Sequence, residues 1–390
     1  MVEELLFLLL PVAALSGWVI GRKRSKGKTG SADCPPLSRD LFQGLNFLLN
    51  EQQDEALEVF IRMSELDNET VDIQFALASL FLRRGEVDRA IRIHQNLIAR
   101  PVLPRAQRNQ ALYELGLDYM RAGLLDRAES LFQELINDAR YGSQCRRQLL
   151  DIFQQEKEWE KAIEVARKLS AANGNKLAPL IAHYYCELAD MALKQGDSAE
   201  AQKLIKRAFS EDKNCVRASL LEAGIAQRHE QPKIAIRAYK RVEQQDADYL
   251  PVIIEPLQKS YEQLGQMGEF AQYLRELVRK QESISLVLAL AQQLCSRGEE
   301  DEAAALLKDY LQRRPSLRAL KYLLELRCIN GESGPYSDVS IIKDIVDKLL
   351  AAKPIYQCNH CGFSSKSMHW QCPGCKQWNT VKPIHGIEGE

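Results

Sequence analysis

Four cysteines near the end of the chain have the spacing of a metal site. They form two Cys-x2-Cys pairs separated by ten residues, Cys358 with Cys361 and Cys372 with Cys375. Each pair can direct two sulfur atoms at one centre, and two facing pairs form the tetrahedral thiolate set that zinc or a single iron prefers. The sequence therefore predicts one metal ion, iron or zinc, bound by these four cysteines.

The residues around the cysteines suit this geometry. Gly362 follows the first pair and Gly374 lies inside the second, where each favours a tight turn that points backbone N–H groups at sulfur. Four thiolates leave no open coordination position for water or substrate, so we expect no catalysis at the metal. Two other interpretations stay open: reduced thiols without a metal, and two disulfides of a secreted domain.

Two histidines and two tryptophans lie close to the cysteines. His360 and His369 are near enough to serve as substitute ligands, but with four cysteines present we expect them to face solvent or to pack. Trp370 and Trp378 are expected to give the apolar cover that so short a segment cannot otherwise build. Residues 354–390 are thus predicted to form a small metal-binding domain.

The composition of the chain sets broader limits. A length of 390 residues allows two or three domains or one long repeat array. The net charge is −1 and no basic face is apparent in the body of the sequence, so we expect no nucleic-acid partner. The other six cysteines occur singly, which is typical of idle thiols in a reducing compartment. They are Cys34, Cys145, Cys186, Cys215, Cys295 and Cys328.

The N-terminal segment has the composition of a membrane anchor. Residues 5–20 are almost unbroken apolar sequence, with two glutamates before them and five cations after them between residues 22 and 28. A secretory signal carries its cations before the apolar stretch. The positive-inside rule instead places the N-terminus outside the cytoplasm and the rest of the chain inside it. We therefore predict one transmembrane helix over residues 1–21, which at about 1.5 Å per residue spans roughly 30 Å.

Some residues argue against a simple anchor. Pro11 and Gly17 weaken the predicted helix, so a cleaved or an interfacial segment stays open as an alternative. Residues 22–36 are rich in Lys, Gly, Ser and Pro, and we interpret them as a basic, flexible tether.

Small residues recur at a fixed phase through the body of the chain. The intervals between them are 34, 38, 34, 39, 34, 35 and 33 residues. This period belongs to tetratricopeptide repeats, in which each unit is an antiparallel pair of helices. The sequence therefore predicts an all-α fold, a tetratricopeptide-repeat superhelix of about eight or nine helix pairs over residues 37–330. The slots hold Ala56, Ala90, Ala128, Ala162, Ala201, Ala235, Phe270 and Ala303.

Other offsets within a unit have mechanical roles. In the third unit the small Gly116 and Ala128 let the two helices approach closely, while Tyr119 and Phe132 fill the space against the next unit. A glycine just past the first helix can adopt a left-handed conformation, cap the helix and turn the chain. An undifferentiated helical solenoid with alanines recurring by chance stays open as the alternative. The predicted turn glycines are Gly85, Gly123, Gly196 and Gly298.

The repeat pattern has irregularities that predict local departures. The two longer intervals predict insertions around residues 99–105 and 171–177. The sixth and seventh units are degenerate, which would allow a local break in the superhelix there. Residues 317–329 and 341–350 have the pattern of closing helices, and we assign residues 331–353 to a capping helix and linker.

The sequence contains no pattern of residues typical of an enzyme: no phosphate-binding glycine loop, no His-Glu-x-x-His motif and no nucleophile elbow. We therefore predict that the protein is not an enzyme. An array of helix pairs forms a concave groove that binds a helix or an extended peptide of another protein. Six side chains are candidates to face the groove, with core packing or a solvated surface as the alternative for each: Asn109, Tyr113, Tyr119, Arg147, Tyr184 and Tyr185.

The order of these segments resembles the lipopolysaccharide assembly protein B family of Gram-negative bacteria. The chain begins Met-Val-Glu-Glu-Leu-Leu-Phe-Leu-Leu-Leu-Pro-Val-Ala-Ala. The repeats follow, and the chain ends with a rubredoxin-type segment, Cys358-Asn-His-Cys361-Gly-Phe and then Trp370-Gln-Cys372-Pro-Gly-Cys375. The resemblance covers essentially the whole chain, and its specificity lies in the order of the three segments.

This resemblance implies a single-pass inner-membrane protein that faces the cytoplasm and restrains lipopolysaccharide synthesis. It implies an adaptor that helps a membrane-bound ATP-dependent metalloprotease degrade a deacetylase, the enzyme that commits precursor to lipid A. The resemblance also implies that the adaptor couples lipopolysaccharide synthesis to export proteins. The four cysteines match the family's metal ligands. Lys376 stands where a rubredoxin usually has glycine, which leaves open whether the metal is rubredoxin-type iron or zinc.

Several other functions stay open beside the adaptor. A generic tetratricopeptide scaffold for envelope assembly would have no proteolytic role, and a periplasmic scaffold would face the other side of the membrane. A zinc ribbon that binds nucleic acid would need more cations than the segment carries. Electron transfer by a rubredoxin-type iron is the one redox chemistry that the cysteines would allow. Dimerisation through the anchor or the repeats also stays open.

Overall fold

The computed structural model of the chain describes residues 71–172, 176–329 and 338–390, with a few single positions between 43 and 59. The predicted anchor over residues 1–21, the tether over 22–36 and the slot at Ala56 lie outside this part. Within it, no helix is both long enough and apolar enough to cross a bilayer. The chain divides into two compact units, residues 1–152 and 153–390, and each is described by itself.

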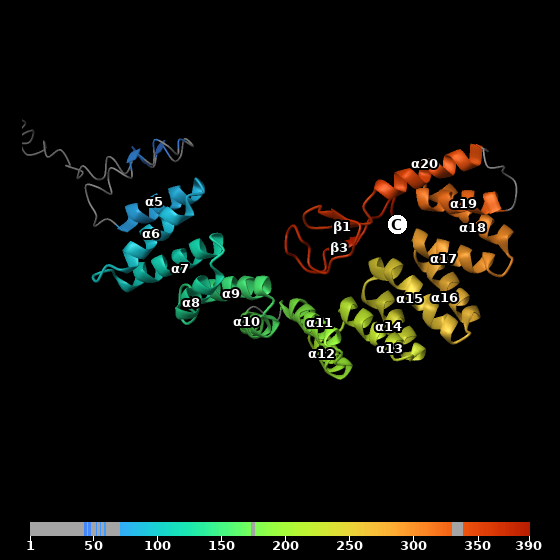
Figure 1. The fold of residues 1–390 in the computed structure, drawn as a ribbon, viewed down its shortest axis with the longest axis horizontal. Coiled ribbons are helices and arrows are strands. Elements are labelled where there is room, and N and C mark those ends of the chain that lie inside the picture. Colours follow the sequence, from blue (N-terminus) through green and yellow to red (C-terminus); the bar gives the residue numbers. More distant parts are fainter. Residues whose placement is uncertain are drawn as a thin grey trace, which may run out of the picture. The chain divides into compact units, whose positions relative to one another are not determined.

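The described part of the first unit consists of helix pairs (Figure 1). Gly116 shows why a pair needs a small residue at the crossing, because a Cβ atom added there would lie 2.6 Å from Cε1 of Phe132. Gln95 Nε2 donates a hydrogen bond to the Tyr119 hydroxyl at 2.9 Å and ties neighbouring pairs together. The helices are α5 (Val71–Arg83), α6 (Val87–Ile98), α7 (Arg105–Arg121), α8 (Leu125–Glu134) and α9 (Gly142–Glu156), the last of which ends in the second unit.

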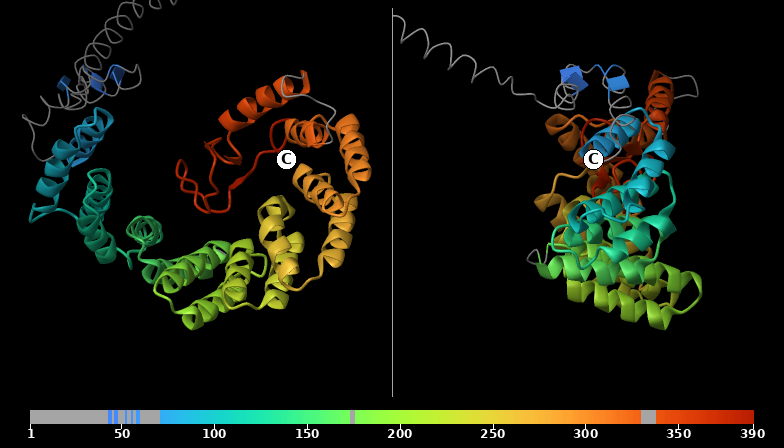
Figure 2. Two further views of the ribbon diagram at one scale, coloured as in Figure 1. Left: turned by 45° about the vertical axis from the view of Figure 1, so that its right-hand side comes forward. Right: turned by 90° about the vertical axis from the view of Figure 1, so that its left-hand side faces the viewer.

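The second unit continues the same pattern and ends in a small β-domain. Its helices follow a curve, and the small domain lies on the inner side of that curve (Figure 2). The helices are α10 (Trp159–Ala172), α11 (Ala178–Lys194), α12 (Ser198–Glu211), α13 (Val216–Arg228), α14 (Pro232–Gln245), the 3-10 helix η1 (Ala247–Tyr249), α15 (Leu250–Gln263), α16 (Met267–Lys280), α17 (Ile284–Cys295), α18 (Glu300–Arg313), α19 (Leu317–Ile329) and α20 (Asp338–Ala352).

The repeat slots form the interior of the helix pairs. All seven described slots, from Ala90 to Ala303, are fully buried, including the one that Phe270 occupies. A fully buried alanine beside a crossing helix leaves no room for a larger side chain, which explains the periodic recurrence of small residues. The expected tetratricopeptide-repeat superhelix is therefore the architecture of the described helices.

The turns inside the pairs are also as predicted. Gly85, Gly123, Gly196 and Gly298 all have positive φ, between 74° and 85°. The fourth and sixth units instead use Lys157 and Glu230, with φ of 60° and 53°. The turn geometry is thus kept even where glycine is absent, at the conformational cost of a left-handed non-glycine residue.

The predicted irregularities have mixed outcomes. The first insertion corresponds to the α6–α7 connection, and the two closing helices are α19 and α20. The second predicted insertion lies between α10 and α11, and its residues 173–175 are outside the described part. A break in the sixth or seventh unit is wrong, because one continuous core extends from Val216 to Leu326 through these units. Pro256 lies inside α15 without interrupting it, and its carbonyl accepts a hydrogen bond from Gln227 Nε2 at 2.7 Å.

Three short antiparallel strands organise the small domain. Strand β1 (Tyr356–Cys358) lies between β2 (Ser364–Ser365) and β3 (Val381–Pro383). Tyr356 pairs with Ser365 on one side and with Pro383 on the other. The buried centre of the domain is small, since it consists of Cys358, Cys372 and Val381 with Tyr356 and Phe363 packed around it.

Candidate metal centre

The four cysteine sulfurs lie together at the edge of the small sheet. All four Sγ atoms are within 4.8 Å of one another. The Sγ–Sγ distance is 3.7 Å between Cys358 and Cys375 and 3.6 Å between Cys361 and Cys372. A tetrahedral site with metal–sulfur bonds of about 2.3 Å has sulfur–sulfur edges of about 3.8 Å. The residues therefore fit a single metal ion bound by four thiolates.

Two equivalent turns hold the cysteines in place. The Gly362 N–H donates to the Cys358 carbonyl at 2.9 Å, and the Lys376 N–H donates to the Cys372 carbonyl at the same distance. Both turn residues are left-handed, with φ of 78° at Gly362 and 60° at Lys376. The lysine noted in the sequence thus keeps the geometry that glycine adopts in the first turn, and carries the strain of that conformation.

The protonation of the thiols depends on their neighbours. Burial raises the pKa of the Cys358 thiol, but the Thr380 hydroxyl and the backbone N–H groups of Cys361 and His360 outweigh it and lower the pKa to about 6. The Gln377 backbone N–H lowers the pKa of Cys375, but burial and the neighbouring cysteine sulfurs raise it to about 12. Four thiolates this close repel one another, so a bound cation is required to keep all four ionised.

The histidines considered as substitute ligands are not part of this cluster. His360 is exposed. His369 lies beside β2, where its Nε2 is 3.2 Å from the Ser365 hydroxyl and 3.1 Å from the Ser367 hydroxyl. Within the described residues, the group with metal-binding geometry contains the four cysteines and neither histidine.

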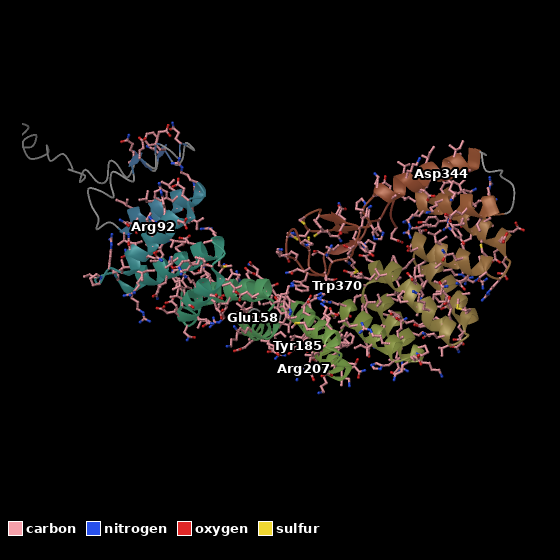
Figure 3. The ribbon with its side chains drawn as sticks, viewed as in Figure 1. Arg92, Glu158, Tyr185, Arg207, Asp344 and Trp370 are labelled. Carbon is pink, nitrogen blue, oxygen red and sulfur yellow. The ribbon has the colours of Figure 1, made fainter. Side chains whose placement is uncertain are left out.

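The tryptophans have a different role from the one expected. The Trp370 ring stacks on Tyr249 at 5.4 Å, and the Trp378 ring stacks on His183 at 5.2 Å. Trp378 Nε1 also donates to Gln154 Oε1 at 3.0 Å. Both rings therefore contact the helices of the second unit instead of covering the small domain's own centre, and Figure 3 shows Trp370 on the side of the domain that faces those helices. These rings anchor the domain to the repeats.

Polar contacts complete this interface around Tyr249. The Tyr249 hydroxyl donates to Asn379 Oδ1 at 2.7 Å. Lys382 Nζ pairs with Asp246 at 2.7 Å and with Asp248 at 2.8 Å. The Lys382 side chain is only 18% exposed, so its two carboxylate partners offset the loss of water around its charge.

A buried charge cluster supports the other side of the interface. Arg217 is 5% exposed and pairs with Glu187 at 2.7 Å and with Asp190, and its guanidinium lies 5.9 Å from the centre of the Trp370 ring. Burial lowers the pKa of the neighbouring His183 to about 3, with a further contribution from Arg217. His183 is therefore neutral near pH 7, which suits a ring that stacks on Trp378.

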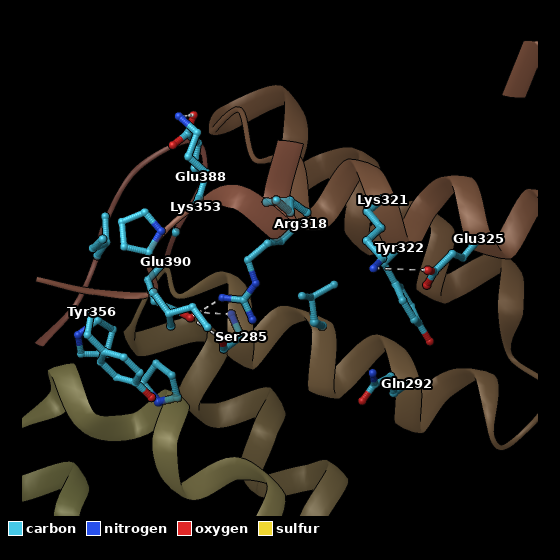
Figure 4. A pocket seen from close by; sticks show the side chains of 18 residues that line it. Ser285, Gln292, Arg318, Lys321, Tyr322, Glu325, Lys353, Tyr356, Glu388 and Glu390 are labelled. Carbon is cyan, nitrogen blue, oxygen red and sulfur yellow. Dashed lines mark hydrogen bonds and ion pairs between the residues drawn. The ribbon is translucent and has the colours of Figure 1, made fainter. Parts of the chain in front are cut away.

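The segment after β3 closes the interface at α17 and α19. The Glu390 carboxylate accepts hydrogen bonds from Ser283 Oγ at 2.8 Å, the Ser285 N–H at 3.1 Å and the Ser285 hydroxyl, and pairs with Arg318. Burial favours the neutral acid, but Arg318 and the serine hydroxyls hold the pKa of Glu390 below its ordinary value. A carboxylate at the start of α17 is further favoured by the helix dipole. A cavity of about 510 Å³ lies beside this contact (Figure 4).

The single cysteines behave as fillers in the described structure. Cys145, Cys186 and Cys215 are buried, and Cys295 is half-buried. Burial raises the pKa of Cys145 to about 11, which keeps the thiol protonated. Cys186 and Cys215 lie side by side, with their Sγ atoms 3.8 Å apart. Cys34 and the side chain of Cys328 lie outside the described residues.

The candidate groove residues mostly have packing roles. Tyr119 is buried, and Tyr113 stacks on Tyr141 at 5.1 Å. Asn109 donates to Asp138 at 2.7 Å. Tyr184 is fully buried with the edge of Trp378 against it. Tyr185 accepts a hydrogen bond from Arg167, and Arg147 is exposed.

The sequence candidates did not include the residues that hold the small domain. These residues are Gln154, His183, Arg217, Asp246 and Tyr249. Their side chains are common in helices and loops. One feature of the sequence could have pointed to Tyr249: it lies between the sixth and seventh units, where the repeat pattern is weak and constrains residue types less.

The fold and the cysteine cluster together define a tetratricopeptide-repeat protein with a rubredoxin-type metal-binding domain. Residues 75–144 and 186–249 match the tetratricopeptide repeat family, and residues 356–383 match the family described as the rubredoxin metal binding domain. The chain is 38% identical over 387 residues to lipopolysaccharide assembly protein B of Escherichia coli K12, covering 99% of each chain. It is 34% identical over 395 residues to the protein of that name from Haemophilus influenzae, again covering 99% of each. The chain belongs to the lipopolysaccharide assembly protein B family.

Proposed function

We propose that this protein is a membrane-anchored adaptor that faces the cytoplasm and regulates lipopolysaccharide synthesis. In this proposal it promotes proteolysis of the lipid A-committing deacetylase by a membrane-bound ATP-dependent metalloprotease, and it couples synthesis to export. The observation that carries the proposal is the full-length relationship to proteins named for lipopolysaccharide assembly. The helix-pair architecture supports a binding role, because such arrays present surfaces for other proteins.

The physical mechanism is confinement. An adaptor held at the bilayer next to a membrane protease raises the effective concentration of any captured substrate near that protease. Weak contacts then suffice, and the adaptor itself needs no chemistry. This mechanism requires the predicted anchor over residues 1–21, and it makes the repeats the part of the chain that recognises the deacetylase.

The metal has a structural role in this proposal. When bound, it would supply the closure that keeps residues 354–390 folded, and it would be held by Cys358, Cys361, Cys372 and Cys375. The domain could then present Trp370 and Trp378 to the helices of the second unit. We propose rubredoxin-type iron, with zinc as the alternative that the same thiolates accept. Metal analysis of the purified protein, with the visible absorption of an iron–thiolate centre, distinguishes them.

The adaptor role is tested by the lifetime of the deacetylase in cells. Depleting the protein is expected to lengthen that lifetime, and inactivating the protease first should abolish the difference. Replacing Cys358 and Cys361 by serine is expected to raise the deacetylase level as depletion does. An unchanged deacetylase lifetime, together with a lipopolysaccharide defect, would favour the second candidate, a scaffold for envelope assembly without a proteolytic role.

A further inference from the structure

The connection between α6 and α7 has an exposed apolar tip. Val102 is 89% exposed, more than any other large apolar side chain in the described part of the chain. Pro101 and Pro104 flank it, and both are exposed. Figure 1 shows this connection at one end of the α6–α7 pair. A single exposed valine is ordinary on a protein surface, so its meaning depends on the charges around it.

The sequence around this tip carries only positive charge. Residues 90–113 contain four arginines and no aspartate or glutamate, and Figure 3 labels Arg92 on α6. Arg92, Arg105 and Arg108 are exposed, and Arg100 is half-buried. None of the four forms an ion pair within the residues that the structure describes, whereas Arg89 of α6 pairs with Glu86 and Arg121 of α7 pairs with Asp118.

The acidic group facing the connection from the next pair is already engaged. Asp138 accepts the N–H groups of Tyr141 and Arg140 and the Asn109 side chain, and these bonds, in that order, hold its pKa below the ordinary value. The charge of Arg105 adds a smaller effect in the same direction. The exposed Arg140 adds a further cation on this side. The stretch from residue 90 to residue 113, with four arginines and no carboxylate of its own, is thus net positive.

This combination matches the surface of an anionic bilayer. Arginine binds phosphate oxygens with two parallel hydrogen bonds, and cations close to an anionic leaflet each strengthen attachment. Val102 can enter the boundary between head groups and acyl chains. Proline lacks a backbone N–H, so Pro101 and Pro104 reduce the number of donors that would lose water there. A protein partner would instead need a broader apolar surface than one projecting side chain.

We propose that the α6–α7 connection docks on the phospholipid head groups of an anionic membrane, with Val102 inserted and Arg92, Arg100, Arg105 and Arg108 on the phosphates. This contact would hold the first unit at the bilayer surface. It depends on a membrane within reach of the chain, as in the proposed function, but it is independent of any role in proteolysis.

Photo-crosslinking of the full chain tests the proposal. A photo-reactive amino acid replaces Val102, or as a matched control Ile234, an apolar residue of the second unit that is 45% exposed. The protein is reconstituted with vesicles of phosphatidylethanolamine and phosphatidylglycerol, or of phosphatidylcholine alone. We expect phospholipid adducts at position 102 in the anionic vesicles, with several-fold fewer in phosphatidylcholine and few at position 234.

Charge variants test the role of the arginines. Changing all four to glutamine is expected to reduce the adducts at position 102 by at least about tenfold, since each cation near an anionic surface contributes on the order of 1 kcal/mol. The matched control removes the same charge from exposed cations of the second unit, Lys206, Lys213, Lys233 and Arg237, and should leave the adducts unchanged.

Co-sedimentation with the vesicles reports separately on the predicted anchor. Sedimentation of the protein with no more lipid adducts at position 102 than at 234 would overturn the proposal while leaving the anchor intact. Adducts that survive the four-arginine change would also overturn it, as would crosslinking in intact cells to an acidic protein instead of lipid. Adducts at 102 without effects on the deacetylase would support the contact and count against the adaptor role alone.

Discussion

The two units use the same repeat position in different ways. Gln110, Gln144, His183 and Arg217 are separated by 34, 39 and 34 residues, so they occupy one slot in successive first helices. In the first unit Gln144 is exposed and Gln110 half-buried, whereas in the second unit His183 and Arg217 are each 5% exposed. The slot is thus solvated in the first unit and covered by Trp370 and Trp378 in the second.

This difference shows what the repeat period does not control. The period determines which residues pack inside each helix pair, and these are alike in both units. The residue on the open face is free to vary, and its identity decides whether that face remains available or receives the metal-binding domain. This face of the first helices therefore stays exposed to solvent in the first unit, whereas in the second unit the metal-binding domain covers it.

Removal of the metal is expected to have the largest effect. Changing Cys358 and Cys361 to serine should unfold residues 354–390, because a segment of this size depends on metal binding worth on the order of 10 kcal/mol. His183 and Arg217 would then become as accessible as Gln144. Hydrogen exchange should rise in α11 and α13 and stay unchanged in α5 to α8. Cys295→Ser serves as the control, and a metal-free variant with unchanged exchange in α11 would contradict the expectation.

Removal of one anchoring ring is expected to separate docking from metal binding. Trp378→Ala deletes the stack on His183 and the bond to Gln154. A loss of about 3 kcal/mol at the interface follows from losing a large aromatic contact. The four thiolates remain, so the metal content should be unchanged while α11 exchanges faster. Tyr113→Ala in the first unit is the matched aromatic deletion and should leave α11 protected. Loss of the metal in the tryptophan variant would show that docking and metal binding are coupled.

Acidification is expected to loosen the covered slot of the second unit. The pKa of His183 is lowered to about 3 by burial and by Arg217, so below about pH 6.5 the undocked state binds a proton more readily than the docked state. Docking should therefore weaken as the pH falls, by roughly 2 kcal/mol between pH 7 and pH 5. His183→Gln introduces the residue found at this slot in the first unit and should remove most of this pH dependence.

The measurement for the histidine is hydrogen exchange in α11 at several pH values, corrected for the intrinsic rate. Metal content is followed in parallel, so that protonation of the thiolates is recognised. The same pH response in the wild type and the glutamine variant would show that another group is responsible. The helices of the first unit, with glutamine at this slot, serve as an internal reference.

The smallest expected effect concerns the two equivalent turns of the metal site, at Gly362 and Lys376, which can be compared directly. Lys376 has φ of 60° where the equivalent Gly362 has φ of 78°. Lys376→Gly should stabilise the loaded domain by about 0.5–1 kcal/mol, and Gly362→Lys should destabilise it by a similar or larger amount, because only glycine adopts this conformation without strain. Thermal unfolding of the metal-loaded protein measures both changes. If Lys376→Gly did not stabilise the domain, the Lys376 side chain would have to make a contact that compensates for its backbone strain.

Local features of the chain were predictable because their causes are local. Gly196 turns a helix pair, and Ala201 fits the crossing that follows, for reasons contained within one repeat. The Cys-x2-Cys spacing likewise determines most of the arrangement of the four sulfur atoms. Phe270 could be placed in a slot by phase alone, although its size broke the pattern. The suspected break nearby was wrong, because packing against neighbouring units compensated for weak repeat signals.

The sequence by itself determined the paired helices, their turns and the set of four thiolates, because each depends on residues within about one repeat length. Only the tertiary structure decided that Trp378 meets Gln154, 224 residues away, and that Tyr249 meets Asn379 across 130 residues. Such contacts have no period and no motif. They arise where the curve of the second unit brings an aromatic, a buried arginine and two aspartates to the face on which the metal-binding domain packs.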